Sequence, residues 1–444
     1  MKNILLIGAG KSSEVLINYL IDLCKKESWS LLVVAKEVVS NQQTSVTVAQ
    51  YVICDVFQDN RLTSWIKSAD IVISMLPARL HFGIAKGCLV HSKNFLSASY
   101  VSDDMKLIHQ EVESKGLLFL NECGLDPGLD HMSAMKVIND IKAEGGDIVG
   151  FESFAGGLIA PDSDDNPWHY KLTWNPRNVV LAGQGEAAKF KQNNTFKYIP
   201  YQQLFRRTER IEITGYGKFE GYANRDSLKY ESLYGLEGIN TLFRGTLRRE
   251  GFCKAWSKLV SLGMTDDSYS IEIPQGMTYR DFTNLFLNYH HSNSVEVKFQ
   301  RALNVAQDDF NVIEKMEFLG LFSQVEIPLI TASPAQILQQ LLEEKWRLKK
   351  EDRDMIVMWH KFNYEQNGEA KEIHSSLVVE GETQARTAMA KTVGLPLGIA
   401  AKMMLTNKIK AKGVLIPTHH EIYMPILKEL SDDFGIKFKE ESIT

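Results

Sequence analysis

Short apolar runs recur through the first 120 residues and are separated by more polar segments. The first run covers residues 3–7, and five more follow at residues 31–35, 50–54, 70–76, 94–99 and 117–120. Continuous apolar runs of this length are typical of strands that are buried on both faces of a parallel sheet. Most of the intervening segments are long enough for a crossover helix. The pattern therefore predicts an α/β fold with a doubly wound parallel sheet.

The first apolar run ends in a glycine-rich turn, and residues 14–20 have a helical pattern. A strand, a glycine turn and a helix in this order are the context of a dinucleotide-binding fingerprint. Gly8 permits the tight turn, Gly10 lets the backbone approach a pyrophosphate, and the helix N-terminus supplies amide groups. Ser13 stands at the third position, where glycine or alanine is usual. A turn that binds nothing would show the same short motif.

The carboxyl ends of the predicted strands mark the edge of the sheet where ligands are expected. The residues at these ends are Gly8, Lys36, Glu37, Asp55, Leu76 and Ser99. The repeated β-α units favour a nicotinamide cofactor, with its pyrophosphate against the turn that contains Gly8, Gly10, Lys11, Ser12 and Ser13. A carboxylate after the second strand favours NAD, whereas a cation there favours NADP. Both Lys36 and Glu37 occupy this place, and we expect NAD or NADP with a slight preference for NAD.

Composition and charge exclude several classes of protein. The chain has 444 residues, of which 44% are hydrophobic and 24% charged, values that exclude long disorder. A formal net charge of −5 indicates no nucleic-acid partner. The apolar runs are shorter than the roughly 20 residues of a membrane helix, and no leader pattern follows Met1. We therefore expect a cytoplasmic protein without a membrane partner. The five cysteines include no CxxC pair and the histidines no HExxH, so we expect no metal site.

Candidate chemistry begins after the sixth apolar run, in the segment 121–131 (NECGLDPGLDH). Asp126 suits a helix N-cap and Pro127 the first helical position, so capping alone would explain Asp126. Two later segments are each centred on an arginine, Arg225 and Arg244. Arginine's planar fork binds a carboxylate through two hydrogen bonds. The pair points to an acidic substrate, although a surface ion pair would explain either arginine alone.

Across nearly its whole length the chain resembles the saccharopine dehydrogenases of the glutamate-forming type, also called saccharopine reductases. The late motifs look closer to the dehydrogenase half of the bifunctional lysine-degrading enzyme than to the fungal reductases. The matching segments are 121–131, Gly156-Gly157, Ala160-Pro161, Asn166-Pro167, Tyr170-Lys171, Trp174, 224–227, 244–248, 353–358, 389–396, 411–413, 421–423 and 425–427.

The resemblance implies three parts. A Rossmann domain would comprise residues 1–125 plus about 388–444, an α/β substrate domain residues 126–236 plus about 335–387, and a mainly helical insertion residues 237–334. The Rossmann domain is then discontinuous. The resemblance also suggests a homodimer.

The resemblance further implies a reaction and a site. Saccharopine, which is glutamate joined to 2-aminoadipate semialdehyde through a secondary amine, would be oxidised by NAD or NADP and then hydrolysed to L-glutamate and the semialdehyde. The implied substrate site comprises Ser99, Tyr100, Asp126, Asn224, Arg225, Arg244, Gly245 and Thr246. The implied cofactor contacts also include Ala98, Leu125 and Trp174. Asp126 and Tyr100 are the candidates for the acid–base group, with water or the substrate's own amine as alternatives.

Two positions depart from the family's usual pattern, and two other functions remain open. Ala155 stands where relatives commonly have cysteine, and Arg79 lies in a segment that usually contains tyrosine. A carboxynorspermidine- or homospermidine-forming enzyme would act on a more cationic adduct, against which Arg225 and Arg244 argue. A non-catalytic cofactor-binding protein is the other alternative, and the intact Asp126, Arg225 and Arg244 motifs argue against it.

Overall fold

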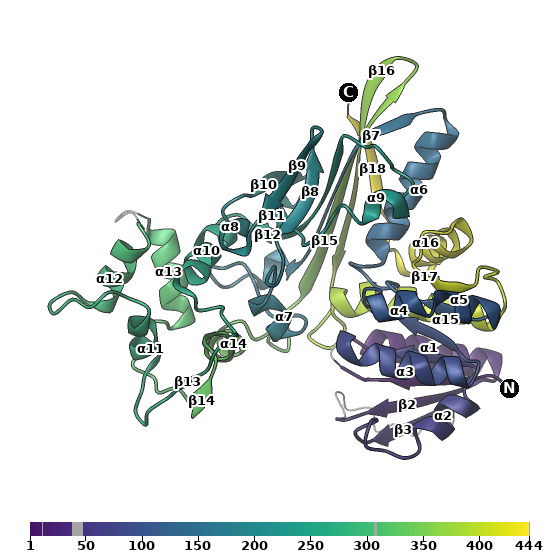
Figure 1. Ribbon diagram of the computed structural model, residues 1–444, viewed down its shortest axis with the longest axis horizontal. Helices are drawn as coiled ribbons and strands as arrows, with labels where there is room; N and C mark the ends of the chain where they lie inside the picture. Colours follow the sequence, from purple (N-terminus) through teal and green to yellow (C-terminus); the bar gives the residue numbers. More distant parts are fainter. Residues whose placement is uncertain (11, 38–47, 306–308, 444) are drawn as a thin grey trace. The chain divides into compact units, whose positions relative to one another are not determined.

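The computed structural model describes residues 1–10, 12–37, 48–305 and 309–443. They form two compact units, Met1–Ile148 with Asn363–Thr444 and Val149–Phe362 (Figure 1). We call these the first and the second unit. The division into three parts, with boundaries near residues 126, 237, 335 and 388, stays a prediction beside this description.

A parallel sheet of seven strands forms the centre of the first unit, in the order β17-β6-β5-β4-β1-β2-β3. All of its neighbouring strands run parallel. The strands are β1 (Asn3–Ile7), β2 (Ser30–Ala35), β3 (Ala49–Ile53), β4 (Ile71–Ser74), β5 (Asn94–Ser97), β6 (Leu118–Leu120) and β17 (Gly413–Leu415). The six apolar runs of the sequence are the first six of these strands, so the predicted α/β fold is confirmed. The seventh strand was not predicted.

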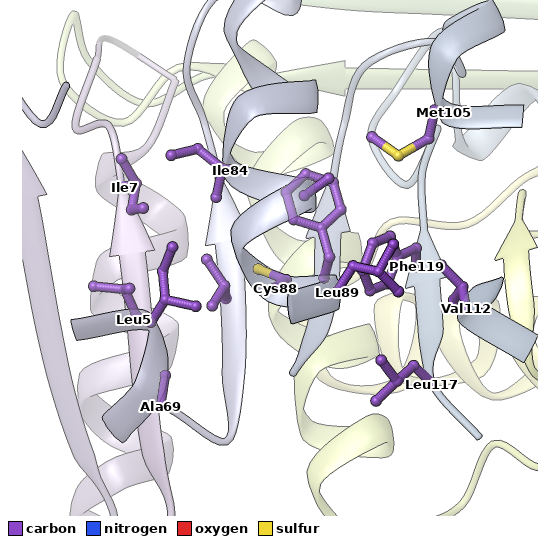
Figure 2. Packing of buried hydrophobic residues seen from close by; sticks show 14 of the residues in the cluster. Leu5, Ile7, Ala69, Ile84, Cys88, Leu89, Met105, Val112, Leu117 and Phe119 are labelled. Atoms are coloured by element: carbon purple, nitrogen blue, oxygen red, sulfur yellow. The ribbon is translucent and has the colours of Figure 1, made fainter. Parts of the chain in front are cut away.

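Helices cover the sheet because its strands carry apolar side chains towards both faces. Leu5 and Ile7 of β1 pack in one hydrophobic cluster with Ile84, Cys88 and Phe119 (Figure 2). Ile4 and Leu6 alternate with them and are also buried. The helices of the first unit are α1 (Glu14–Glu27), α2 (Leu62–Ser68), α3 (Ala78–Val90), α4 (Asp103–Leu107), α5 (His109–Ser114), α6 (Leu129–Ala143), α15 (Ala388–Leu405) and α16 (His420–Phe434).

Helix α15 packs closely against α1, although nearly four hundred residues separate them in the sequence. A Cβ atom at Gly394 would lie 2.9 Å from the backbone nitrogen of Leu16, and one at Gly398 would lie 2.4 Å from the ring of Tyr19. Glycines are therefore required for this approach. By length and composition alone α15 could cross a membrane, but 78% of it is buried inside the structure, as in the core helix of a folded domain.

The helix that follows the 121–131 segment begins later than the sequence predicts. Asp126 is not its N-cap and Pro127 is not its first residue, because α6 begins at Leu129. Gly128 has a φ of 148°, which lies outside the helical region, so the helix cannot include it. Asp130 accepts a hydrogen bond from the Gly128 backbone N–H at 2.6 Å. Capping therefore does not explain Asp126.

The second unit contains a mixed sheet. Strand β7 (Asp147–Ile159), which begins at the boundary of the unit, pairs in parallel with β12 (Thr241–Arg249), and β12 pairs antiparallel with β11 (Gly217–Ala223). Its other strands include β8 (Ala188–Gln192), β9 (Thr195–Ile199) and β10 (Glu209–Ile213). The unit also has a separate two-stranded sheet, which pairs β13 (Ile271–Glu272) with β14 (Thr331–Ala332). Strand β15 (Asp354–Gln366) crosses the second boundary, and β16 (Glu369–Glu380) pairs with β18 (Lys439–Ile443) in the first unit. The helices of the second unit are α7 (Pro176–Val180), α8 (Tyr201–Leu204), α9 (Tyr230–Leu233), α10 (Phe252–Leu262), α11 (Tyr279–Leu285), α12 (Val295–Ala302), α13 (Phe310–Leu319) and α14 (Pro334–Lys345), and the 3-10 turn Pro161–Ser163 follows β7.

A buried lysine holds two loops of the second unit together. The Nζ atom of Lys171 lies 2.8 Å from Asp165 and 2.7 Å from Asp352, and the Lys171 side chain is only 2% exposed. Lys349 also reaches Asp165 but is 66% exposed. Burial alone would raise the pKa of Asp165, but hydrogen bonds from Lys171 and Lys349 lower that pKa to about 2. The buried lysine therefore neutralises carboxylates that come from two distant segments of the chain.

We expect Lys171→Met to destabilise the protein by about 3–5 kcal/mol, because it leaves the buried carboxylate of Asp352 without its cation. The matched variant Lys349→Met removes an exposed partner of Asp165 and should cost far less, because solvent screens an exposed ion pair. Urea unfolding measures both free energies. The pKa of Asp165 is depressed in the folded state, so this stabilisation should be present above about pH 4 and be lost as the pH falls towards 2. Equal losses for the two variants would contradict the assignment.

Candidate active site

The turn after β1 has the geometry of a phosphate cradle. Gly8 has a φ of +98°, and a Cβ atom there would lie 2.9 Å from the backbone carbonyl of Met75. Gly10 differs, because a Cβ atom there would meet no described atom within 4 Å. Gly8 is thus required for the turn itself, whereas the space above Gly10 is open to a ligand that approaches the N-terminal end of α1. Lys11, the next predicted cofactor residue, lies outside the described residues.

Ser13 stabilises the turn from inside. Its side chain is buried, and its hydroxyl donates a hydrogen bond to the Gly10 carbonyl at 2.6 Å. Its backbone carbonyl accepts a hydrogen bond from Ile17, in the first turn of α1. Serine at the third fingerprint position therefore fastens the turn to the helix. Ser12 lies between them and is half-buried.

The ends of β2 and β3 bring one cation and one carboxylate together. The Nζ atom of Lys36 lies 3.5 Å from Asp55, and Lys36 remains largely exposed. Glu37 is exposed beside them. These three predicted cofactor residues thus lie on neighbouring strands at one edge of the sheet.

The ends of β4 and β5 carry a group that the sequence analysis missed. The imidazole of His81, from α3, lies between two serine hydroxyls: Nδ1 is 2.8 Å from Oγ of Ser74 and Nε2 is 2.7 Å from Oγ of Ser99. Desolvation lowers the pKa of His81 to about 4. The sequence held a signal, since Ser74 and Ser99 are polar residues within two of the predicted apolar runs, 70–76 and 94–99. The predicted cofactor residues Leu76 and Ala98 follow the same two strand ends.

Two of the predicted substrate residues, Tyr100 and Asp126, contact each other in the structure. The Tyr100 hydroxyl donates a hydrogen bond to Oδ1 of Asp126 at 3.0 Å, and Tyr100 is 44% exposed. The segment that carries Asp126 is tied to the end of β5, because the backbone N–H of Glu122 donates to the Ser99 carbonyl. Leu125, a predicted cofactor contact, is buried in this segment. The structure thus brings Ser99, Tyr100 and Asp126 to one edge of the first unit.

Buried charges fix the segment around Asp126. His131 is fully buried, with Nε2 2.9 Å from Glu122 and Nδ1 3.4 Å from Asp130. Glu122 also accepts a hydrogen bond from the backbone of Val101, next to Tyr100. Because buried charged groups are retained only when they are paired and hydrogen-bonded, this cluster holds residues 122–131 in one conformation relative to β5.

The remaining predicted substrate residues lie in the second unit, on β11 and β12. The Thr246 hydroxyl donates to the side-chain oxygen of Asn224 at 2.7 Å, and the Asn224 backbone N–H donates to the Arg244 carbonyl. A Cβ atom at Gly245 would lie 2.3 Å from the ring of Phe154, so packing explains this glycine. The structure thus brings Asn224, which follows the end of β11, together with Arg244, Gly245 and Thr246 in the middle of β12.

The two predicted arginines differ in their surroundings. Arg244 is only 3% exposed, and its guanidinium lies 4.1 Å from the centre of the Tyr230 ring. Arg225 is exposed, and its backbone carbonyl accepts a hydrogen bond from Lys189. A third arginine, Arg248, was not predicted. It is buried on β12, and no carboxylate of the described residues pairs with it.

Three further positions from the sequence analysis are placed by the structure. Trp174 lies in the second unit, half-buried, with its indole N–H 3.4 Å from the Tyr170 hydroxyl. Ala155 is buried on β7 opposite Thr246. Arg79 is exposed in the first turn of α3. The cofactor role of Trp174 and the substrate roles of Asn224, Arg225 and Arg244 stay predictions.

A hollow in the second unit, of about 690 Å³, contains none of the predicted site residues. Charged side chains of both signs surround it. Its lining residues are Asp164, His169, Lys218, Arg249, Glu250, Gly251, Lys254, Asp309 and Asn311. Within the described ranges, no group of three or more histidine, cysteine or acidic side chains is arranged to hold a metal ion.

Comparison with known proteins identifies two consecutive family regions. Residues 4–120 match the "Saccharopine dehydrogenase NADP binding domain", and residues 124–436 match the "Saccharopine dehydrogenase C-terminal domain". The first match indicates a nicotinamide cofactor, which agrees with the open turn at Gly10 and the strand ends around it. It does not confirm the preference for NAD.

Individual relatives agree with the family match. The saccharopine dehydrogenase [NADP(+), L-glutamate-forming] of Saccharomyces cerevisiae is 30% identical over all of this chain and 99% of its own length. A solved apo structure titled saccharopine dehydrogenase (L-Glu forming), from the same yeast, superimposes with a TM-score of 0.88 over both full chains at 30% identity. The alpha-aminoadipic semialdehyde synthase of Arabidopsis thaliana is 34% identical over 87% of this chain. The chain spans only 38% of that longer protein.

The two fingerprint glycines should respond differently to substitution. We expect Gly10→Val to leave the unfolding midpoint nearly unchanged, because the added atoms meet no described atom within 4 Å, and to weaken nicotinamide cofactor binding by about tenfold or more, because the backbone can no longer approach the pyrophosphate. Gly8→Ala should instead lower the midpoint, because its Cβ atom collides with the Met75 backbone at a positive φ. Thermal unfolding and cofactor titration by nicotinamide fluorescence measure the two effects. An unchanged cofactor affinity in Gly10→Val would overturn the fingerprint assignment.

Proposed function

Because the chain belongs to the saccharopine dehydrogenase family, we propose that it oxidises saccharopine, with a nicotinamide cofactor and water, to L-glutamate and 2-aminoadipate 6-semialdehyde. When bound, the cofactor accepts a hydride from the carbon beside the secondary amine. The amine also loses a proton, which leaves an imine, and water adds to the imine to release the two products. The reverse reaction is a reductive condensation. The observation that carries the proposal is the Tyr100–Asp126 pair at the carboxyl edge of the cofactor-binding sheet.

The Tyr100–Asp126 pair suits the proton transfers of this reaction. As a carboxylate, Asp126 takes the proton that the amine loses, and as an acid it returns a proton to the amine of the departing glutamate. Tyr100 donates its hydroxyl hydrogen to Asp126 and is partly exposed, so it links the carboxylate to water. The buried cluster of Glu122, Asp130 and His131 keeps this carboxylate in place.

The arginines of the second unit suit a substrate with three carboxylates. Arg244 lies on a paired strand, and its guanidinium packs against the ring of Tyr230, which restrains the side chain. Arg225 lies next to Asn224 and is exposed. We assign the binding of substrate carboxylates to these two side chains, with Asn224 and Thr246 as polar neighbours. Each charge-assisted contact contributes about 1.5–3 kcal/mol.

The end of β2 supports a preference for NAD. The cation that would meet the extra phosphate of NADP, Lys36, already lies beside the carboxylate of Asp55. Glu37 adds a second carboxylate, which suits the ribose diol of NAD and repels a phosphate. The fungal relative named after NADP(+) sets the opposite expectation. A cytoplasmic location and a homodimer stay predictions.

The direct test is the formation of reduced cofactor from saccharopine, followed at 340 nm with NAD and with NADP in separate reactions. We expect turnover with a higher kcat/KM for NAD, and one glutamate released for each cofactor reduced. Turnover of a polyamine adduct in place of saccharopine would replace the proposed substrate. Cofactor binding without turnover of any amine adduct would favour a non-catalytic role.

Substitution of the arginines should separate substrate binding from cofactor binding. We expect Arg225→Ala and Arg244→Lys each to raise the KM for saccharopine by about 10- to 100-fold, because one charge-assisted contact is lost or loses its bidentate geometry. Cofactor affinity should change less than about twofold, since the first unit is untouched. Arg249→Ala, at the end of the same strand, is the control and should leave both constants unchanged. Equal loss of substrate and cofactor affinity would indicate a structural role instead.

A further inference from the structure

Ser74, His81 and Ser99 form a chain of hydrogen bonds at the carboxyl ends of β4 and β5. Ser74 is fully buried, His81 is 5% exposed, and Ser99 is half-buried at the open end of the chain. Packing also restrains the imidazole ring, because the ring lies edge-on against the ring of Phe95 with 6.3 Å between the ring centres. Its two nitrogens therefore have fixed and different partners, at 2.8 and 2.7 Å.

The buried end of this chain determines the direction of its hydrogen bonds. Within the described part of the protein, Nδ1 of His81 is the one hydrogen-bond partner of the Ser74 hydroxyl. A buried O–H group that donates to nothing is destabilising, whereas an oxygen with a spare lone pair is tolerated better. Ser74 therefore donates to Nδ1. The neutral imidazole then carries its hydrogen on Nε2, and Nε2–H donates to the Ser99 oxygen.

The low pKa of His81 supports this assignment independently of the geometry. Because desolvation lowers that pKa to about 4, the imidazole is neutral at ordinary pH and has one N–H group to place. A charged imidazolium would donate from both nitrogens and would leave the Ser74 hydrogen without this acceptor. The neutral ring thus matches one donor, Ser74, on its buried side and one acceptor, Ser99, on its open side.

We propose that His81 is a positioning residue that makes Ser99 a hydrogen-bond donor to a carboxylate of the substrate. Because Nε2–H occupies a lone pair of the Ser99 oxygen, the hydroxyl hydrogen of Ser99 turns away from the imidazole, towards the ligand edge of the sheet. Such a hydroxyl selects an anionic acceptor over the ammonium group of an amine. This proposal rests on the proposed function for the identity of the substrate, but the direction of the hydrogen bonds does not depend on it.

A double-mutant cycle on Ser74 and Ser99 tests the proposed role of the Ser99 hydroxyl in substrate binding. We expect Ser99→Ala to raise the KM for saccharopine about tenfold, because the hydroxyl donor is lost. Ser74→Ala should raise it only about threefold, because the Ser99 hydroxyl remains and only the preference for hydrogen on Nε2 of His81 is lost. In the Ser99→Ala protein, Ser74→Ala should add nothing to KM. Cofactor affinity should stay within about twofold in all three proteins. Additive effects, or a loss of cofactor affinity equal to that of saccharopine, would overturn the proposal.

Ser97→Ala is the matched control for this cycle. Ser97 is fully buried at the end of β5, as Ser74 is at the end of β4, but its hydroxyl donates to Asn121 at 3.1 Å and not to the imidazole. We expect the KM for saccharopine to be unchanged in Ser97→Ala. An increase equal to that of Ser74→Ala would show that any buried hydroxyl at this edge has the same effect, and would contradict the proposal.

The tautomer of His81 provides a measurement without turnover. In protein labelled with ¹⁵N-histidine, the His81 signals are assigned by their absence from the His81→Asn spectrum, and their chemical shifts report which nitrogen carries hydrogen. We expect the Nε2–H form in the native protein and a mixture of tautomers in Ser74→Ala. The Nδ1–H form in the native protein would refute the direction. If the expected tautomer is found but saccharopine is not turned over, the proposed function fails while the hydrogen-bond direction stands.

Discussion

A side chain at Gly8 would collide with the backbone of Met75, and the order of the first unit depends on this close approach. Gly8 follows β1 and Met75 follows β4, so these two neighbouring strands of the parallel sheet end side by side. The chain then turns into α1, which begins at Glu14. The same edge receives the ends of β2 and β5. The predicted cofactor residues of the first unit and the Tyr100–Asp126 pair share this edge because its strands run parallel, and Gly8 permits the close approach of the chain at its centre.

In each unit, a cluster of ionisable side chains around one buried residue holds irregular segments of the chain in place, although the residues differ. In the first unit, two carboxylates flank His131 and fix the segment that carries Asp126. In the second, two carboxylates flank Lys171 and join loops that lie far apart in the sequence. In each cluster one buried nitrogen-bearing side chain contacts two carboxyl groups, so each cluster constrains where its loops can lie. Such contacts can fix the conformation of a segment that is neither a strand nor a helix.

Much of the first unit could be predicted from the sequence because its signals are local. Apolar runs identified β1 to β6, and the glycine turn identified the cofactor edge. Strand β17 was missed because three residues near residue 414 have no pattern of their own and gain strand structure only beside β6. The predicted start of α6 was wrong because Asp126-Pro127 favours a helix start locally, whereas the positive φ of Gly128 prevents a helix from continuing through that position. His81 was missed because its role comes from partners on two other elements, and no spacing along the chain reveals such a contact.

The contact between α15 and α1 has a consequence for the order in which the protein can fold during synthesis. The first 120 residues already contain six strands of the parallel sheet, but the strand that completes it, β17, and the helix whose glycines receive α1 lie beyond residue 387. At the usual 5–20 residues per second, the ribosome needs roughly 15–60 s to reach β17 after finishing β6. Throughout that interval the nascent chain exposes the unpaired edge of β6 and the face of α1 that later packs against α15. The first unit therefore cannot be completed until β17 has been synthesised. A chain released before that point would leave an open sheet edge to which chaperones or other chains could bind.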